Sequence, residues 1–126
     1  FLQTGRHITE FQNAPRAGAI APDAFRILIN PPLDVLRGRI ATRVPKMLAG
    51  GAVTEGRAVI ASGWDARRAI GAAQMVAYLR GEIDMDTCIQ NWITKTNQYA
   101  KRQRTWFRTQ FAADIVLENS AMPITF

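Results

Sequence analysis

A long amphipathic helix is the feature that most limits what this chain can fold into. Apolar side chains recur every three or four residues over a stretch that opens at Asp84 to Asp86 and runs to about Thr109. This spacing is typical of an α-helix that packs one face on a core. Cys88, on that face, is predicted to be a small core residue. The repeating positions are Met85, Cys88, Ile89, Trp92, Ile93, Thr96, Tyr99, Ala100, Gln103, Trp106 and Phe107.

The C-terminal part of this helix concentrates positive charge beside aromatic rings. Residues 99–108 contain four cations and three aromatic side chains, and no acid lies between Asp86 and Asp114. The charge by itself could simply form a solvated basic face. Arginine beside aromatic residues, however, favours a surface that binds a polyanion such as nucleic acid. Trp106 and Phe107 are predicted to be core residues rather than stacking platforms. The cations predicted to face the nucleic acid are Lys95, Lys101, Arg102, Arg104 and Arg108.

A short strand and a second amphipathic helix are predicted upstream. Residues 25–29 form an apolar run bounded by loop and by two prolines, which is typical of a buried strand. Asn30 is a suitable N-cap and Pro31 a suitable first residue for the helix that follows. Pro45 should bend this helix, at a cost of roughly 3 kcal/mol in an ideal helix, and Gly50-Gly51 should end it. Its apolar side carries Leu33, Leu36, Ile40, Val44, Met47 and Leu48.

Three arginines are interleaved with that apolar side. Arg39 and Arg43 are four residues apart, so their side chains rise from one helical face and can converge on one phosphate. Arg37 is assigned to surface solubility, as most helical arginines are. We therefore treat Arg39 and Arg43 as candidate anion-binding residues.

The rest of the chain is predicted to be mainly helical. Further helices are expected over about 54–61 and about 67–79, the second closed by Gly81. Asp65 is expected to cap the second of them. Residues 114–117 are a candidate second short strand. These elements predict an α/β fold class with one buried strand, possibly two, among several helices.

Composition narrows the function classes. The chain has 126 residues, of which 48% are hydrophobic, which is enough for one domain with a core. Sixteen basic against 10 acidic residues give a net charge of +6 and a pI near 10.4, so nucleic acid, phosphate metabolites or a membrane surface could be partners. No run of about 18 apolar residues exists that could span a bilayer. One cysteine and the absence of a signal peptide favour the cytoplasm.

Little in the residues indicates a catalytic site. Residues 51–58 are a near miss of the phosphate-binding loop G-x-x-x-x-G-K-[ST], with Arg57 for the lysine and Ala58 for the hydroxyl, and they follow a helix rather than a strand. We reject that motif. His7 is the sole histidine, and no Cys/His cluster supports a metal site. The residues alone therefore indicate a basic, phosphate- or RNA-oriented chain and identify no reaction.

Ordered segments along nearly the whole chain resemble the tRNA dimethylallyltransferase family. Residues 39–48 are similar to the family pattern R-I-x-x-R-V-x-x-M-L, and residues 99–108 to Y-A-K-R-Q-x-T-W-F-R. The chain departs from the family at Ala72, where an aromatic residue is common, and at Asn97, where arginine is common. The other similar segments are residues 1–12, 29–33, 68–71 and 78–83.

The resemblance implies a reaction and a domain organisation. The family moves a dimethylallyl group from dimethylallyl diphosphate to the amine of the adenine next to the tRNA anticodon, with Mg²⁺ assisting. Its fold is a phosphate-loop α/β core with an inserted helical domain. Residues 1–23 would then be the tail of the inserted region and a loop, and residues 24–126 a strand plus helices of the core. The N-terminal half with the phosphate loop and the general base is not in this sequence, which opens on Phe1 and is interpreted as a fragment.

The resemblance also assigns roles to residues. Arg39 corresponds to a family arginine that reaches the active site and holds the diphosphate, and it is our candidate catalytic residue. Arg43 is a second candidate for diphosphate binding. Lys101, Arg102 and Arg104 would lie against the tRNA backbone or support the catalytic channel. The implied partners are the tRNA anticodon stem-loop and dimethylallyl diphosphate, with Mg²⁺ ligands outside this sequence.

Two other readings stay open at this stage. The chain could be a stand-alone basic helical RNA-binding module, or a packing half whose charge serves only solubility. On the leading reading, the chain alone should be inactive because it lacks a phosphate loop. The strand at residues 25–29 would be an edge piece of a parallel sheet whose partners are missing. We therefore expect self-association through this strand.

Overall fold

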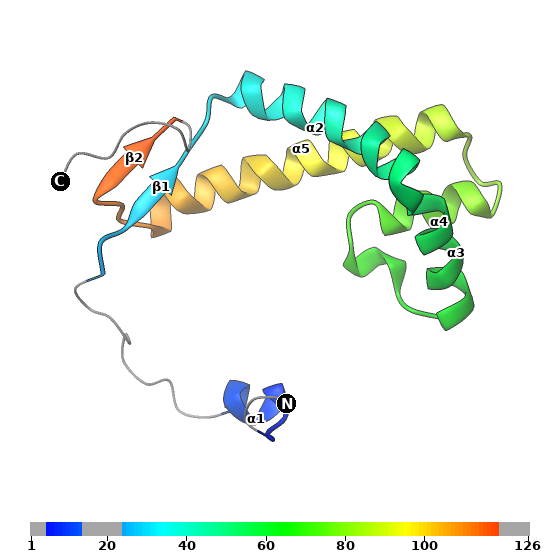
Figure 1. Cartoon of the computed structure of the whole chain (residues 1–126), viewed down its shortest axis with the longest axis horizontal. Coiled ribbons are helices and arrows are strands. Elements are labelled where there is room, and N and C mark those ends of the chain that lie inside the picture. The colour runs from blue at the N-terminus through cyan, green and yellow to red at the C-terminus, as the bar shows by residue number, and fades with distance from the viewer. Residues whose placement is uncertain (1–4, 14–23, 119–126) are drawn as a thin grey trace.

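The computed structural model describes residues 5–13 and 24–118 (Figure 1). Residues 1–4 and 14–23, which belong to the predicted tail of the inserted region and its loop, lie outside these ranges. Within them, no helix is both long and apolar enough to cross a membrane. The elements in chain order are α1 (Ile8–Asn13), β1 (Ile27–Ile29), α2 (Leu33–Met47), a π-helical turn η1 (Leu48–Ala52), α3 (Val53–Ser62), a 3₁₀ turn η2 (Ala66–Arg68), α4 (Ala72–Leu79), α5 (Met85–Gln110) and β2 (Ile115–Leu117).

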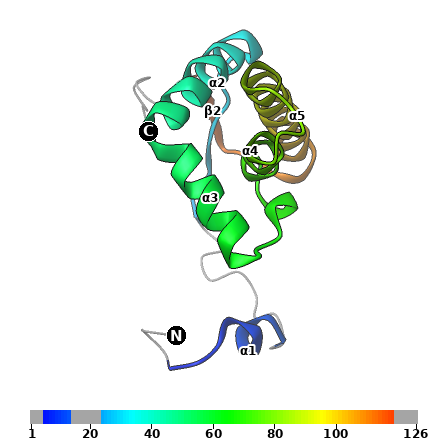
Figure 2. The ribbon, with the colours of Figure 1, turned by 90° about the vertical axis from the view of Figure 1, so that its right-hand side faces the viewer.

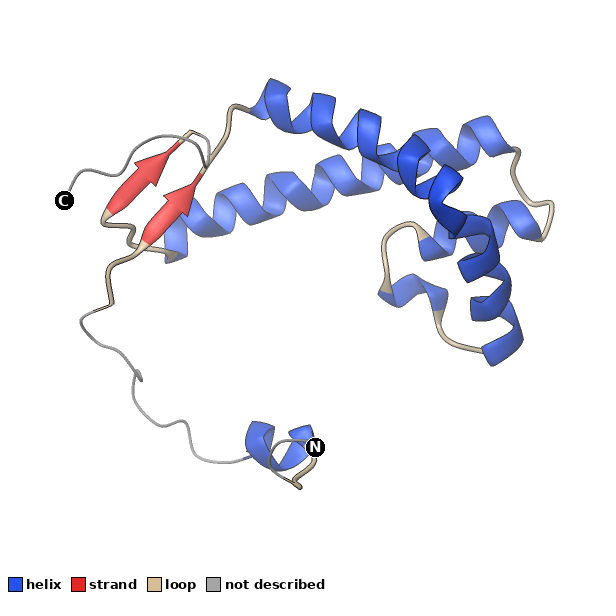
Figure 3. Ribbon diagram, in the orientation of Figure 1, coloured by secondary structure: helices blue, strands red, loops and turns tan. Residues whose placement is uncertain are grey.

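Two helices side by side form the axis of the molecule. α2 lies along α5, the two strands lie at one end of this pair, and α3 with α4 lies at the other (Figures 1 and 2). Strands make up only a small part of the described chain (Figure 3). In the same view, α1 lies apart from helices α2 to α5. The long helix predicted from Asp84 to about Thr109 is confirmed. Asp84 caps it by accepting a hydrogen bond from the Thr87 backbone N–H at 2.7 Å.

The core lies at the helical end, where α2, η1, α4 and α5 meet. Its buried members are Val44, Ala52, Met75, Cys88 and Trp92. Cys88 is fully buried, which confirms its prediction as a core residue, and burial raises the pKa of its thiol. The N-terminal half of the apolar face that the sequence predicts for α5 therefore packs on this core.

The start of α2 differs from the prediction. The helix begins at Leu33 with Pro32 at the N-cap, so Asn30 does not cap it and Pro31 is not its first residue. The Asn30 backbone N–H instead donates to the carbonyl oxygen of Leu117 at 2.7 Å, which continues the pairing of the strands. Pairing with a neighbouring strand thus outweighs the local preference of Asn30 for a helix start.

Two glycines set the breaks between helices. α2 continues through Pro45 to Met47, and the chain turns at Gly51, whose φ is +111°. The helix predicted over about 67–79 is wrong as one element, because Gly71 at φ +94° separates η2 from α4. Asp65 accepts a hydrogen bond from the Arg67 N–H at 3.1 Å, so the predicted cap is confirmed for η2.

The strands form a two-stranded parallel sheet. Ile27, Leu28 and Ile29 pair in register with Ile115, Val116 and Leu117. This confirms the second strand, and it corrects the expectation that the first strand has no partner within the chain. The prediction of a buried strand over residues 25–29 is wrong for this chain, because Ile27 is 38% exposed and Ile29 is 50% exposed, and only Leu28 between them is half-buried. Self-association through this sheet stays a prediction.

Candidate anion-binding surface

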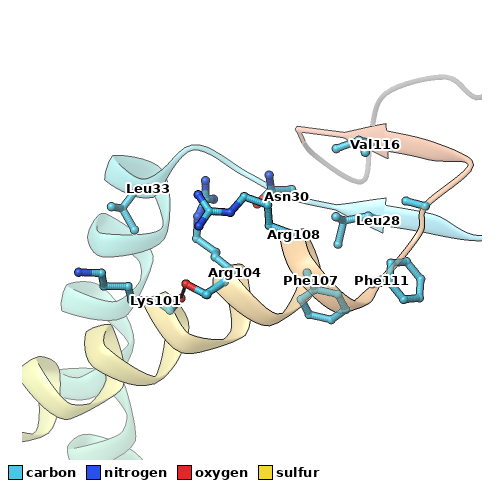
Figure 4. A pocket seen from close by; sticks show the side chains of 11 residues that line it. Leu28, Asn30, Leu33, Lys101, Arg104, Phe107, Arg108, Phe111 and Val116 are labelled. Carbon is cyan, nitrogen blue, oxygen red and sulfur yellow. Dashed lines mark hydrogen bonds between the residues drawn. The ribbon is translucent and has the colours of Figure 1, made fainter.

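A cavity of about 480 Å³ lies where the end of α5 meets the carboxyl end of β1 (Figure 4). Lys101, Arg104 and Arg108 line it from α5, and Asn30 lines it from the residue that follows β1. None of the described residues that line it is acidic. In parallel sheets, ligands bind at the carboxyl ends of the strands. The rest of the wall is mostly apolar, with Leu28, Leu33, Phe107, Phe111, Ala113 and Val116.

Arg104 is the cation that packing holds in place. Its side chain is half-buried and donates a hydrogen bond from Nη1 to the carbonyl oxygen of Pro31, just before α2. This bond ties α5 to the chain between β1 and α2. Lys101 and Arg108 are exposed on either side of it along α5. The cavity therefore combines one fixed guanidinium with two cations that can adapt to an anion.

Arg39 and Arg43 share a second, shallow hollow of about 540 Å³ on the exposed side of α2. Lys46 also lines this hollow, and sequence reasoning did not single it out. The spacing of three and four residues places all three cations on one face, and no ion pair to any of them is found within the described residues. Arg37 lies outside the hollow. The arrangement can hold a phosphate or diphosphate group.

The aromatic residues of α5 are more exposed than predicted. Trp106 is 52% exposed, so its prediction as a core residue is wrong, whereas Phe107 is half-buried. The Trp106 ring meets Phe107 edge-on at 5.1 Å between ring centroids. Arg102 is exposed, and its guanidinium carbon lies 5.9 Å from the centre of the Tyr99 ring. Lys95 is exposed as well.

A third concavity, of about 390 Å³, lies between α2, η2 and α5, and we call it the α2–η2–α5 cleft. It includes Arg43 and Tyr99 and adds Arg68, which sequence reasoning had noted only as part of a family segment. The meeting of three separate elements creates this cleft. No periodicity within any one of them could have indicated it.

The described residues do not form a metal centre. No group of three or more His, Cys, Asp or Glu side chains in ranges 5–13 and 24–118 is placed to hold an ion. The side chains within these ranges therefore do not fit a Mg²⁺ site.

The geometry thus defines a basic, mainly helical chain with two short parallel strands, and cations cluster at the strand ends and on α2. The model of the IPP transferase family matches residues 1–110. The chain belongs to this family, which confirms the resemblance seen in the sequence.

Relatives and solved structures agree with this assignment. The tRNA dimethylallyltransferase of Acidiphilium cryptum is 41% identical over 117 residues, covering 90% of this chain and 36% of that protein. That of Cereibacter sphaeroides is 44% identical over 113 residues, covering 85% and 35%. The tRNA delta(2)-isopentenylpyrophosphate transferase of Staphylococcus epidermidis superposes with a TM-score of 0.72 at 29% identity, over 79% of this chain and 34% of that one. The chain thus spans little more than a third of the length of these relatives.

Proposed function

We propose that the chain forms part of a tRNA dimethylallyltransferase, which moves the dimethylallyl group of dimethylallyl diphosphate to the amine of the adenine beside the anticodon. Membership of the IPP transferase family and the names of the relatives support this reaction. The observation that carries the chain's own share in it is the hollow on α2, which Arg39, Arg43 and Lys46 line and in which none of the described lining residues is acidic. We include Mg²⁺ as a cofactor of the proposed reaction only because the chain belongs to this family.

Arg39 is proposed to hold the leaving diphosphate. Negative charge grows on the diphosphate as its bond to the dimethylallyl carbon breaks, and a guanidinium fixed beside it stabilises that charge. Arg43 rises one helical turn further along the same face and is proposed as a second contact to the diphosphate. Both side chains are exposed in this chain, so they are available to a ligand.

The cations of α5, which lie on more than one side of the helix, are proposed to contact the tRNA anticodon stem-loop. Lys95, Lys101, Arg102 and Arg108 are exposed and would contact phosphates, which gives affinity and register without reading sequence. Arg104 is proposed to contact a phosphate from its fixed position beside Pro31. The rest of the catalytic site, with the phosphate loop, is proposed to come from outside these 126 residues.

A chimera tests the proposal. This chain would replace the matching segment of the Acidiphilium cryptum relative, and prenyl transfer to an anticodon stem-loop would be measured. Arg39→Ala should lower kcat by about 100-fold or more with RNA binding retained, because it removes a contact to developing charge. Arg37→Ala, which removes the same charge from the same helix outside the hollow, should leave kcat unchanged.

Three results would count against the proposal or part of it. An unmutated chimera that transfers nothing contradicts it at the first step. Unchanged turnover in Arg39→Ala removes Arg39 from the diphosphate. Loss of RNA binding alone would favour the alternative of a basic RNA-binding module. The 126-residue chain by itself is expected to be inactive.

A further inference from the structure

The α2–η2–α5 cleft has an apolar floor and a charged rim. Ile40 and Val44 from α2 and Trp92 from α5 form its buried parts. Arg43 from α2 and Arg68 from η2 line the cleft, and none of the described residues that line it is acidic. A space with one apolar, aromatic surface and a cationic rim suits a flat apolar group that is joined to a phosphate.

Tyr99 supplies an aromatic surface that packing leaves open. Its ring is 47% exposed although it lies on the apolar repeat of α5, whereas Trp92, two turns earlier, is 5% exposed. The guanidinium of Arg102 lies 5.9 Å from the ring centre, within the range of a cation–π contact. A half-exposed tyrosine flanked by arginines is the kind of platform on which unpaired bases stack.

The charge of Arg68 is left largely uncompensated. Its Nε lies 3.9 Å from Asp65, and its side chain is 75% exposed. The neighbouring Arg67 takes that carboxylate instead, with Nε at 2.9 Å and Nη2 at 3.2 Å from its two oxygens. Arg67 does not line the cleft, so the adjacent arginines differ in their roles. Arg68 is the one placed to contact an anion there.

We propose that the α2–η2–α5 cleft binds one unstacked nucleotide of the RNA substrate, its base against Tyr99 and the apolar floor, its phosphate on Arg68. The proposal rests on the proposed function for the identity of the RNA. Arg43 borders both this cleft and the hollow that Arg39 lines, so the two concavities are neighbours on α2. The nucleotide in the cleft is therefore one that flanks the modified adenine.

Binding of a labelled anticodon stem-loop to the 126-residue chain tests the proposal by fluorescence anisotropy at several salt concentrations. Tyr99→Leu keeps the apolar volume but removes the ring, and should weaken binding roughly 5- to 100-fold, the range that one base stack supplies. Tyr99→Phe should bind as the unmutated chain does. Arg68→Gln should weaken binding and lower the slope of log K against log salt by about 0.7, the value for one single-strand phosphate. Arg67→Gln is the matched control and should leave affinity and slope nearly unchanged.

The outcomes separate this proposal from the proposed function. If the unmutated chain does not bind the stem-loop, the RNA role of this surface fails and the cleft assignment fails with it. If the chain binds but Tyr99→Leu and Arg68→Gln bind as well as their controls, only the cleft assignment is overturned. Displacement of the stem-loop by dimethylallyl diphosphate in the unmutated chain but not in Arg68→Gln would assign the cleft to the prenyl donor instead, and would also overturn it.

Discussion

The two halves of α5 carry the same apolar repeat but meet different surroundings. In the N-terminal half, Cys88 and Trp92 are buried against α2, η1 and α4. In the C-terminal half, Tyr99 and Trp106 are about half exposed, and the inward positions are held by Ala100, Arg104 and Phe107. Periodicity indicates which side of a helix is apolar, but burial depends on which elements cover that side.

The two ends of the molecule are also held together differently. The helical end is joined by apolar packing around Met75 and Trp92. The strand end has a smaller apolar contact, between Phe107 and Phe111, and relies more on polar contacts, including the bond from Arg104 to Pro31 and the pair formed by Arg26 and Asp114. Apolar packing resists changes of pH and salt, whereas exposed polar pairs do not. Three experiments, with five variants between them, test how differently the parts of the molecule respond.

Matched tryptophan substitutions should give the largest difference. Trp92→Ala removes a buried ring from the core and should lower the free energy of unfolding by about 3–5 kcal/mol. Trp106→Ala on the same helix should cost about 1 kcal/mol or less, because half of that ring is already exposed. Urea unfolding followed by circular dichroism measures both. Equal losses would show that the C-terminal half of α5 is covered in solution.

Matched glycine substitutions should change the free energy of unfolding by smaller amounts. We expect Gly56→Ala to lower it and Gly38→Ala to raise it. An added Cβ at Gly56 in α3 would overlap the Met75 side chain and lie 2.9 Å from Cδ1 of Leu79, so Gly56→Ala should cost about 1–3 kcal/mol. Gly38 lies inside α2 with nothing within 4 Å of an added Cβ. Gly38→Ala should therefore stabilise the chain by about 0.5–1 kcal/mol. A stabilising Gly56→Ala would mean that α3 and α4 are not in such close contact.

The smallest effect should be a pH dependence at the strand end. Hydrogen bonds from the Arg26 side chain, and then from its backbone N–H, lower the pKa of Asp114 below its ordinary value of 3.8. The folded state thus favours the carboxylate, so its contribution is complete above that value and is lost as the pH falls through the lower folded value. Asp114→Asn should remove this part of the acid dependence.

Urea unfolding at neutral and acidic pH measures that dependence. Asp65 and Asp84 also have lowered pKa values, from hydrogen bonds with Arg67 and Thr87. The variant should therefore still lose stability in acid, by less than the unmutated chain. Identical pH profiles of the two chains would show that the pair of Arg26 and Asp114 contributes nothing to folding.

Several elements could be predicted from the sequence because their signals are local. The bounds of the long helix follow from its repeat and from the cap at Asp84, and both strands follow from short apolar runs. The shared face of Arg39 and Arg43 follows from helical spacing alone. The break at Gly71 was missed, because a glycine in a helical pattern is ambiguous until its neighbours are known. Here Gly71 is needed because an added Cβ would overlap the Trp92 ring.

The sequence by itself determined the long helix α5, the body of α2, the placement of charge along them and the family to which the chain belongs. These depend on residue types at fixed separations, and the separations are the same in the chain and in the helix. Only the tertiary structure decided that Asn30 pairs with β2, that Arg104 is held beside Pro31, and that Arg68 and Tyr99 share a cleft. Those outcomes depend on contacts between residues far apart in the chain, and no local pattern encodes such contacts.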